Sequence, residues 1–571
     1  MKYRLVNKEI TDNYCRELLK ERGIEDTEKF LHPDISCLQS QYDLDNINNG
    51  IEVIEKTIFN EKPYAIIADC DTDGICSFTI IYQYLKKINP EKKIEFFIHE
   101  GKQHGFSDLI DKLQEKDWSL IIAPDSATND GQYIKQFQCP VLVIDHHIKE
   151  ESSIIPPNMI LINNQTSEKY KNKNLCGGGM VWQFCRALDD HYEKNLANEY
   201  LDLCAISIIG DMMSMLEYEN QYLVQKGLSQ IKNGMLKMLF EKQDYSTGGK
   251  INPTTVAFYI VPLINAMIRV GTQEEKERLY LSFIMPNVMI ESRKRGSRGL
   301  LERLCVESTR ECVNAKARQD REKDKMVEQL EMKIFKEDLL ENQILFVELD
   351  DDDDFPPELN GLVAMNLASK YHKPTIVARL NEEGFIRGSA RALSNTELAS
   401  FKDYLAKTGF FEYTLGHDFA FGLSVLDKNL SKLHHQANEE LSKIDFGENI
   451  YDVNFIVDSS SDKIGDIILE LSNYENLWGQ SCPEPQICIK NIKVKNSDLK
   501  VIGKNKDTLR LQQNGITYIK FHAKDLIDSI DGIENLILTI IGRPNINDWG
   551  GRLTPQIIIT DMELEDERFA F

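Results

Sequence analysis

Val141-Leu142-Val143-Ile144-Asp145-His146-His147 is the stretch that decides the fold of this 571-residue chain. Four apolar residues, three of them β-branched, predict a short buried strand, and an acidic residue with two histidines follows it. An acidic residue after a short apolar run recurs three times in the first 215 residues. These repeats are Ala65-Ile66-Ile67-Ala68-Asp69-Cys70-Asp71-Thr72-Asp73-Gly74, Leu120-Ile121-Ile122-Ala123-Pro124-Asp125 and Ala205-Ile206-Ser207-Ile208-Ile209-Gly210-Asp211.

Short β-like runs alternate with amphipathic segments between about residues 62 and 215. This alternation predicts an α/β domain with a parallel sheet. Ligand sites in such sheets lie at the carboxyl ends of the strands, and we expect all four acidic clusters at that position. Four strand ends that carry Asp and His are what a two-metal phosphoesterase site requires.

The rest of the chain divides into further segments. Residues 1–60 favour helices, and 61–285 hold the α/β domain. The charged stretch 286–343 predicts a long connecting helix. A second α/β unit follows at 344–445, and strand-like runs at 446–571 predict a small β-barrel or sandwich.

Bulk composition favours a folded, cytoplasmic, membrane-free protein. The start of the chain lacks the apolar core of a signal peptide, and no run approaches the roughly 18–20 apolar residues of a membrane span. The net charge of −24 argues mildly against bulk attraction to nucleic acid, although a local basic groove remains compatible with it. Twelve cysteines without a Cys-x-x-Cys pair indicate buried, reduced thiols.

The carboxylates of Asp69, Asp71 and Asp73 would project to one side of an extended segment. They would repel one another unless cations lay between them, and the spacing does not match an EF-hand. Asp125 and Asp211 taken singly would more often cap a helix or turn, but their recurrence beside the other clusters favours metal ligation.

His146 and His147 cannot both face one side of a strand. We expect them to turn the corner after it, so that one ligates a metal and the other meets phosphate. Mixed carboxylate and imidazole ligands suit two Mn²⁺ or Mg²⁺ ions. Such ions would support an in-line attack of water on phosphorus.

Three further motifs are polar. Leu175-Cys176-Gly177-Gly178-Gly179 fits a phosphate contact or a plain loop equally well. Arg387-Gly388-Ser389-Ala390-Arg391 and the Gly416-His417 pair fit a phosphodiester backbone, which guanidinium groups bind bidentately. Asp350–Asp354 predicts a solvated surface loop.

With these motifs assembled, the chain resembles the DHH phosphoesterase superfamily, and within it the RecJ-like exonucleases specific for single-stranded DNA. The matching segments are DCDTDG at 69–74, PDSA at 124–127, DHH at 145–147, LCGGG at 175–179, VPLINAMIRVG at 261–271, GSARAL at 388–393, GHDFAFGLS at 416–424 and WGQSCPEPQI at 478–487.

The resemblance implies a DHH domain, a DHH-associated domain joined to it by the long helix, and a C-terminal OB-like β-barrel. It implies metal ligands at Asp69, Asp71, Asp73, Asp125, His146 and Asp211, catalytic roles for His147 and Asp145, and substrate contacts by Arg269, Ser389, Arg391 and His417. The family's activity is 5′→3′ hydrolysis of single-stranded DNA with Mn²⁺ or Mg²⁺, in repair or recombination.

Two other functions compete with that one. A DHH phosphatase or nano-RNA hydrolase would act on short nucleotides, but it would need only two domains. A catalytically inactive single-strand-binding scaffold would have lost Asp or His ligands, and all are present. We expect a monomer whose partner is single-stranded DNA. The acidic surface is compatible with a protein partner that delivers the substrate, but no residue identifies it. The candidate protein partners are a single-strand-binding protein and a helicase.

Overall fold

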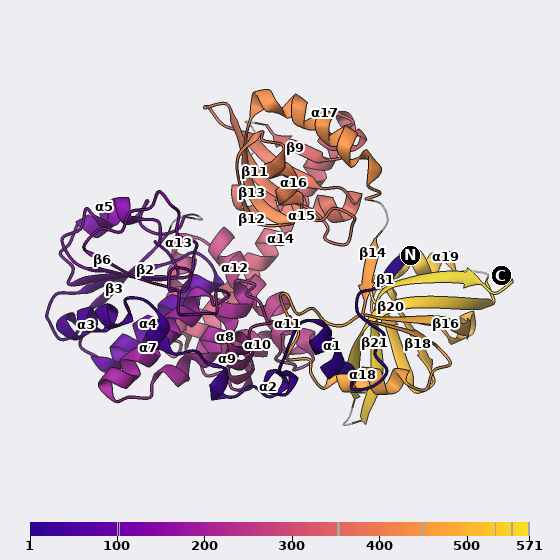
Figure 1. Cartoon of the computed structure of the whole chain (residues 1–571), viewed down its shortest axis with the longest axis horizontal. Helices are drawn as coiled ribbons and strands as arrows, with labels where there is room; N and C mark the ends of the chain where they lie inside the picture. The colour runs from indigo at the N-terminus through magenta and orange to yellow at the C-terminus, as the bar shows by residue number, and fades with distance from the viewer. Residues whose placement is uncertain are drawn as a thin grey trace. The chain divides into compact units, whose positions relative to one another are not determined.

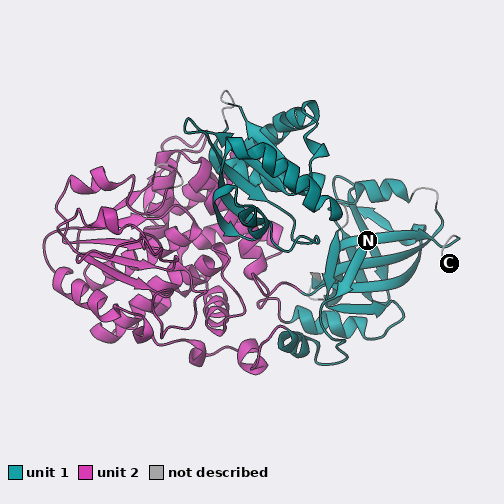
Figure 2. Cartoon of the chain, turned by 45° about the horizontal axis from the view of Figure 1, so that its top comes forward, with its two compact units in different colours: residues 1–21, 319–473, 485–571 teal, residues 22–318, 474–484 magenta. Residues whose placement is uncertain are grey.

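The computed structural model describes residues 1–99, 101, 103–350, 355–446, 449–530, 533–549 and 552–568. It contains two compact units (Figure 2). Unit 1 comprises residues 1–21, 319–473 and 485–571, and unit 2 comprises residues 22–318 and 474–484.

Unit 2 is built on the predicted parallel sheet (Figure 1). Its strands lie in the order β3-β2-β4-β5-β6, and every neighbouring pair is parallel. Each strand except β3 is almost wholly buried, as a sheet covered on both faces requires. The bounds are β2 Tyr64–Ala68, β3 Ile94–Ile98, β4 Leu120–Pro124, β5 Val141–Asp145 and β6 Met159–Asn163.

Helices surround this sheet, and α4, α7 and α8 pack against one another beside it. The helix bounds in unit 2 are α2 Thr27–Leu31, α3 Ile47–Thr57, α4 Thr72–Ile88, α5 Ile110–Gln114, α6 Gly131–Ile134, α7 Gly177–Tyr192, α8 Leu201–Gly210, α9 Tyr218–Ser229, α10 Gly234–Thr247, α11 Pro253–Thr255, α12 Val261–Val270 and α13 Gln273–Ile284. A single π-helical turn at Val256–Ile260 joins α11 to α12.

Two expectations about unit 2 are wrong. Asp211 follows helix α8, not a strand, because the Ile-rich sequence of α8 is apolar on all sides and buried. A short apolar run of that kind has no periodicity that separates strand from helix. The connecting helix α14 spans Leu304–Lys336 instead of 286–343, since β7 (Met289–Glu291) and β8 (Leu301–Arg303) form an antiparallel hairpin before it.

Unit 1 begins with a strand where we expected helix. β1 (Lys2–Leu5) pairs in parallel with β14 (Ile450–Val453), and α1 (Tyr14–Glu21) follows. The second α/β region has a mixed sheet in the order β12-β13-β11-β10-β9. Its elements are β9 Leu345–Leu349, α15 Asn360–Tyr371, β10 Thr375–Leu380, β11 Phe385–Arg391, α16 Phe401–Lys407, β12 Phe411–His417, β13 Ala420–Leu426 and α17 Leu430–Glu440.

The C-terminal region is rich in strands, as predicted. Seven strands form one sheet in the order β15-β16-β20-β21-β19-β18-β17. The bounds are β15 Phe455–Asp458, α18 Ile464–Ser472, β16 Ile487–Lys495, β17 Lys500–Ile502, β18 Thr508–Gln513, β19 Ile516–Lys520, α19 Lys524–Ser529, β20 Asn535–Trp549 and β21 Arg552–Asp566.

The structure bears on the expectations for the cysteines and for apolar helices. All the cysteines except Cys139 are buried, which confirms the predicted burial of these thiols. The described residues include one helical stretch, Pro253–Val270, that is long and apolar enough to cross a membrane by composition. Since 56% of that stretch is buried inside the protein, it also fits a core helix.

Candidate metal centre

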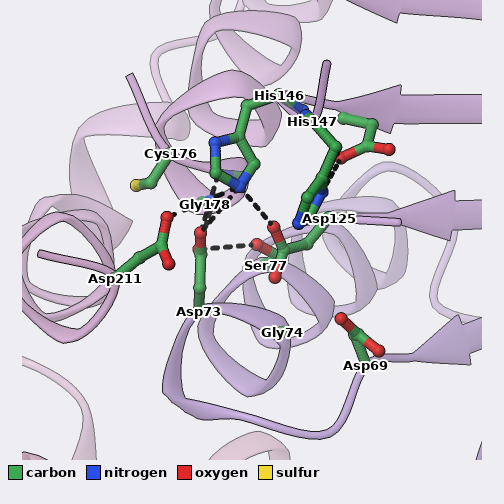
Figure 3. Close-up of polar contacts among 12 residues, drawn as sticks. Asp69, Asp73, Gly74, Ser77, Asp125, His146, His147, Cys176, Gly178 and Asp211 are labelled. Atoms are coloured by element: carbon green, nitrogen blue, oxygen red, sulfur yellow. Dashed lines mark hydrogen bonds and ion pairs between the residues drawn. The ribbon is translucent and has the colours of Figure 1, made fainter. Parts of the chain in front are cut away.

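Asp73 lies in the first turn of α4 and is almost completely buried. Its carboxylate accepts backbone N–H bonds of 2.8 Å from both Gly177 and Gly178 at the start of α7. The hydroxyls of Ser77 and Ser207 also donate to it (Figure 3). A Cβ at Gly178 would lie 2.2 Å from the Ser207 oxygen, so the chain needs glycine there. The glycine-rich segment therefore binds a carboxylate of the protein itself, which neither of our two interpretations of it anticipated.

The other two acids of this cluster precede the helix. Asp71 caps α4, since its side chain accepts a 2.9 Å hydrogen bond from the Gly74 N–H. Asp71 has the extended backbone that we expected for all three residues, whereas Asp73 is already helical. Burial, together with the charges of Asp69 and Asp73, raises the pKa of Asp71 to about 6. Such mutual repulsion is relieved when a cation binds.

Asp145 is the last residue of β5 and holds the turn that follows it. Its buried carboxylate accepts backbone N–H bonds from Thr128 (2.9 Å) and His146 (2.7 Å), and it contacts His147 Nδ1 at 2.8 Å. Burial raises the pKa of Asp145, but the bond and charge of His147 outweigh this effect and hold it well below its usual range. Asp145 thus orients the two histidines.

His146 is the point at which carboxylates from three elements converge, namely the start of α4, the end of β4 and the end of α8 (Figure 3). Its Nε2 lies 3.3 Å from Asp125 Oδ1, 3.5 Å from Asp211 Oδ2 and 3.8 Å from Asp73 Oδ2. Burial lowers the pKa of the His146 imidazole although Asp73 raises it. The neutral imidazole is the form that ligates metals.

Asp125 and Asp211 reach His146 from different elements. Asp125 follows β4 with a left-handed backbone, φ +65°, and its N–H donates to the Ile144 carbonyl of β5. Asp211 ends α8, and burial and the charge of Asp73 raise its pKa to about 8. Burial and the charges of Asp73 and Asp71 raise the pKa of Asp125 well above its usual value.

Two histidines that the sequence analysis missed converge on Asp69. His104 Nδ1 lies 2.7 Å from Asp69 Oδ2, and His99 Nε2 lies 3.9 Å from Asp69 Oδ1. The other ring nitrogen of His99 contacts Asp108 at 2.8 Å. His99 directly follows β3, so its position at a strand end is the signal that could have found it.

The donor set fits divalent cations. Asp69 Oδ1, Asp125 Oδ1 and Asp211 Oδ2 are buried and accept no hydrogen bond within the described residues. A buried, unsatisfied acceptor costs roughly 1–3 kcal/mol, and more when it is charged. Three groups among the described residues have ligand atoms close enough to share an ion, and they are Asp73-His146-Asp211, Asp125-Asp145-His146-His147 and Asp69-Cys70-His104.

The expected substrate contacts fall in both units. Arg269 ends α12 in unit 2, where burial lowers the pKa of its guanidinium and the charge of Asp71 partly opposes that effect. Ser389 and Arg391 lie on β11, and His417 lies on β12 of unit 1. Arg391 and His417 both pair with Ala420 of β13, so all three side chains share one face of that sheet. In the expected acidic loop, residues 351–354 lie outside the described residues.

Comparisons with known proteins agree with this geometry. The model of the DHH family N-terminal domain matches residues 63–208, and that of the RecJ OB domain matches residues 461–561. The SPbeta prophage-derived protein YorK of Bacillus subtilis (strain 168), provisionally named a single-strand DNA-specific exonuclease, is 33% identical over 99% of this chain and 98% of its own length. The chain belongs to the RecJ-like exonuclease family.

Other members of the family are more distant. The single-stranded-DNA-specific exonuclease RecJ of Bacillus subtilis (strain 168) is 24% identical over 96% of this chain and 68% of its own length. The crystal structure of RecJ from Thermus thermophilus in complex with Mn²⁺ superposes with a TM-score of 0.73 at 17% identity. That match covers 98% of this chain and 79% of the other, which confirms the expected fold class.

Metal binding should change the stability of unit 2. In the metal-free protein, Asp125→Asn should raise the melting temperature, because it replaces a carboxyl group whose ionisation is opposed by burial and by the charges of Asp73 and Asp71. Mn²⁺ at a hundred times its dissociation constant should stabilise the wild type by about 2.7 kcal/mol. Differential scanning calorimetry with and without Mn²⁺ measures both effects. Exposed Asp111→Asn is the matched control, and an Asp125→Asn protein that keeps the full Mn²⁺ shift would contradict the site.

The contact between Asp145 and His147 should give His147 a measurably raised pKa in the metal-free protein. Burial lowers the pKa of His147, but Asp145 raises it to about 9, above the ordinary 6.5. The pair should therefore stabilise the fold fully below pH 6.5, and this contribution should be lost as the pH rises through about 9. Asp145→Asn should return the pKa to 6.5 or lower. Nitrogen-15 NMR of the imidazole measures it, and equal titration in both proteins would argue against the pair.

Proposed function

We propose that this chain is a metal-dependent exonuclease that hydrolyses single-stranded DNA from its 5′ end, in DNA repair or recombination. The observation that carries the proposal is the convergence of Asp73, Asp125 and Asp211 on His146, with buried oxygens left without hydrogen bonds among the described residues. Similarity over nearly the full length to a protein named a single-strand DNA-specific exonuclease supports the exonuclease activity and its strand specificity.

We assign the metal ligands to Asp69, Asp71, Asp73, Asp125, His146 and Asp211, as the sequence analysis did. Two Mn²⁺ or Mg²⁺ ions would supply the positive charge that activates water and stabilises the phosphate oxygens. Asp145 holds the backbone N–H of His146 and the imidazole of His147, and it thereby positions both residues. His104 contacts the Asp69 carboxylate directly, and His99 lies close to it. Residues that contact metal-ligating side chains in this way commonly adjust the affinity and reactivity of the bound metal.

Other residues would handle the proton and the strand. His147 has its Nδ1 occupied by Asp145 and its side chain half exposed, so Nε2–H is available to a phosphate oxygen. Arg269 and the Ser389, Arg391 and His417 face would bind further phosphates. Arginine suits this role because its planar fork matches phosphate oxygens.

Hydrolysis of short nucleotides is the alternative within enzymes. A C-terminal OB domain favours the longer substrate, since folds of this kind bind oligonucleotides. Delivery by a single-strand-binding protein or a helicase, a monomeric state and a cytoplasmic location stay predictions.

Substrate choice in the presence of Mn²⁺ can be measured directly. The protein is incubated with Mn²⁺ and end-labelled single-stranded DNA, duplex DNA, RNA or a dinucleotide. We expect mononucleotides released from the 5′ end of single-stranded DNA. Activity confined to dinucleotides would favour the alternative, and absence of any hydrolysis would favour a binding scaffold.

Asp71→Asn should reduce hydrolysis by more than about a hundredfold, because a metal ligand is lost. Asparagine still caps α4, so the fold should persist, which circular dichroism verifies. Asp111→Asn again serves as the surface control. Full activity of Asp71→Asn would remove Asp71 from the site.

A further inference from the structure

The β7–β8 hairpin of unit 2 carries a concentrated positive charge. Its loop, residues 292–300, reads Ser-Arg-Lys-Arg-Gly-Ser-Arg-Gly-Leu, with four cations among nine residues and no acid. The whole chain has a net charge of −24, so this loop is an electrostatic exception. The negative net charge repels polyanions, so a polyanionic ligand could bind only where cations are concentrated locally, as they are in this loop.

Most of these cations are available to a ligand. The side chains of Lys294, Arg295 and Arg298 are exposed, and none forms an ion pair with any residue that the structure describes. Arg293 is the partial exception, since its Nη1 lies 3.2 Å from Glu274. Arginine without an internal partner is the side chain best suited to phosphate.

The loop has a defined backbone. Gly296 and Gly299 adopt φ of +84° and +80°, and N–H bonds run from Ser297 to the Lys294 carbonyl and from Leu300 to the Ser297 carbonyl. The N–H of Gly299 also donates to Glu291 Oε1 at 3.0 Å. Two consecutive turns therefore present the cations from a fixed frame, and less ordering entropy is lost on binding.

The hairpin belongs to the same unit as the metal centre. It directly follows α13, whose Tyr280 hydroxyl donates a 2.6 Å hydrogen bond to the Asp69 carbonyl. The N–H of Arg293 donates to Glu307 of α14 at 3.1 Å. At the base of the hairpin, the N–H of Leu304 bonds the Val288 carbonyl at 2.8 Å. These contacts fasten the hairpin to α14, and the 3.2 Å ion pair between Arg293 and Glu274 links it to α13, the helix that supports the Asp69 strand end.

We infer that the β7–β8 hairpin binds the phosphate backbone of a nucleic-acid strand that the metal centre cleaves, at nucleotides outside that centre. The inference rests on the proposed function for its substrate. Exposed leucines beside the cations favour an unpaired strand, since single-stranded bases leave apolar faces uncovered. The side chains of Leu300 and Leu301 are 62% and 66% exposed.

The test is a binding measurement on the full chain with chelator present, so that no hydrolysis is needed. The probe is a fluorescent oligothymidylate, and anisotropy is followed against salt concentration. The triple variant Lys294→Ala, Arg295→Ala, Arg298→Ala should bind at least about tenfold more weakly. Its slope of log affinity on log salt should become shallower by about two, since each phosphate contact contributes roughly 0.7.

The matched control removes three exposed lysines from the same unit, as Lys169→Ala, Lys226→Ala and Lys242→Ala, with the same change in net charge. It should keep the wild-type affinity and slope. Equal effects of the two triple variants would overturn the inference, since bulk charge would then explain both. Unchanged DNA binding combined with loss of binding to an acidic peptide would overturn it in favour of a protein partner.

The experiment distinguishes an error in the hairpin inference from an error in the proposed function. A wild type that cleaves single-stranded DNA while the hairpin variant binds normally contradicts only the hairpin. A wild type that binds DNA through the hairpin but hydrolyses no substrate contradicts only the enzyme. Arg295→Lys with Arg298→Lys keeps the charge and should retain most of the salt slope, which distinguishes lost charge from a damaged fold.

Discussion

The carboxylate of Asp73 connects three helices at one buried point, and the arrangement of unit 2 depends on it. It belongs to α4, accepts two N–H bonds from the start of α7 and receives the Ser207 hydroxyl of α8. A helix N-terminus stabilises an anion, and charge-assisted hydrogen bonds are stronger than neutral ones. The same carboxylate has an oxygen 3.8 Å from His146, so helix packing and metal-site geometry are fixed by one group.

Much of this site follows from the sequence. Asp69, Asp125 and Asp145 each lie at the end of a buried strand, and the strands are parallel neighbours. Parallel strands present their carboxyl ends along one edge, so a one-dimensional pattern becomes a three-dimensional cluster. The different contacts of the His146 and His147 rings also follow, because a strand end cannot direct adjacent side chains the same way.

The remaining features depend on tertiary packing that periodicity does not encode. The sequence of helix α8 predicts a strand as readily as a helix, because its residues are apolar on all sides and buried. Gly177 and Gly178 match an anion-binding turn, and only the fold supplies the anion, a carboxylate distant in sequence. His104 lies 35 residues beyond Asp69, in a segment without strand or helix periodicity. The hairpin at 289–303 lies in a charged, proline-free stretch whose sequence favours a helix as much as a hairpin.

The charge distribution links the acidic centre to a polyanionic substrate. Crowded carboxylates repel phosphate, so the centre can accept a nucleic acid only when cations neutralise it. Attraction over longer distances must then come from fixed cations outside the centre, since a net charge of −24 opposes approach. The loop at 292–300 supplies such cations within the same unit, with arginine and lysine side chains exposed to solvent. An acidic enzyme can thereby confine its affinity for nucleic acid to the surfaces that guide a strand.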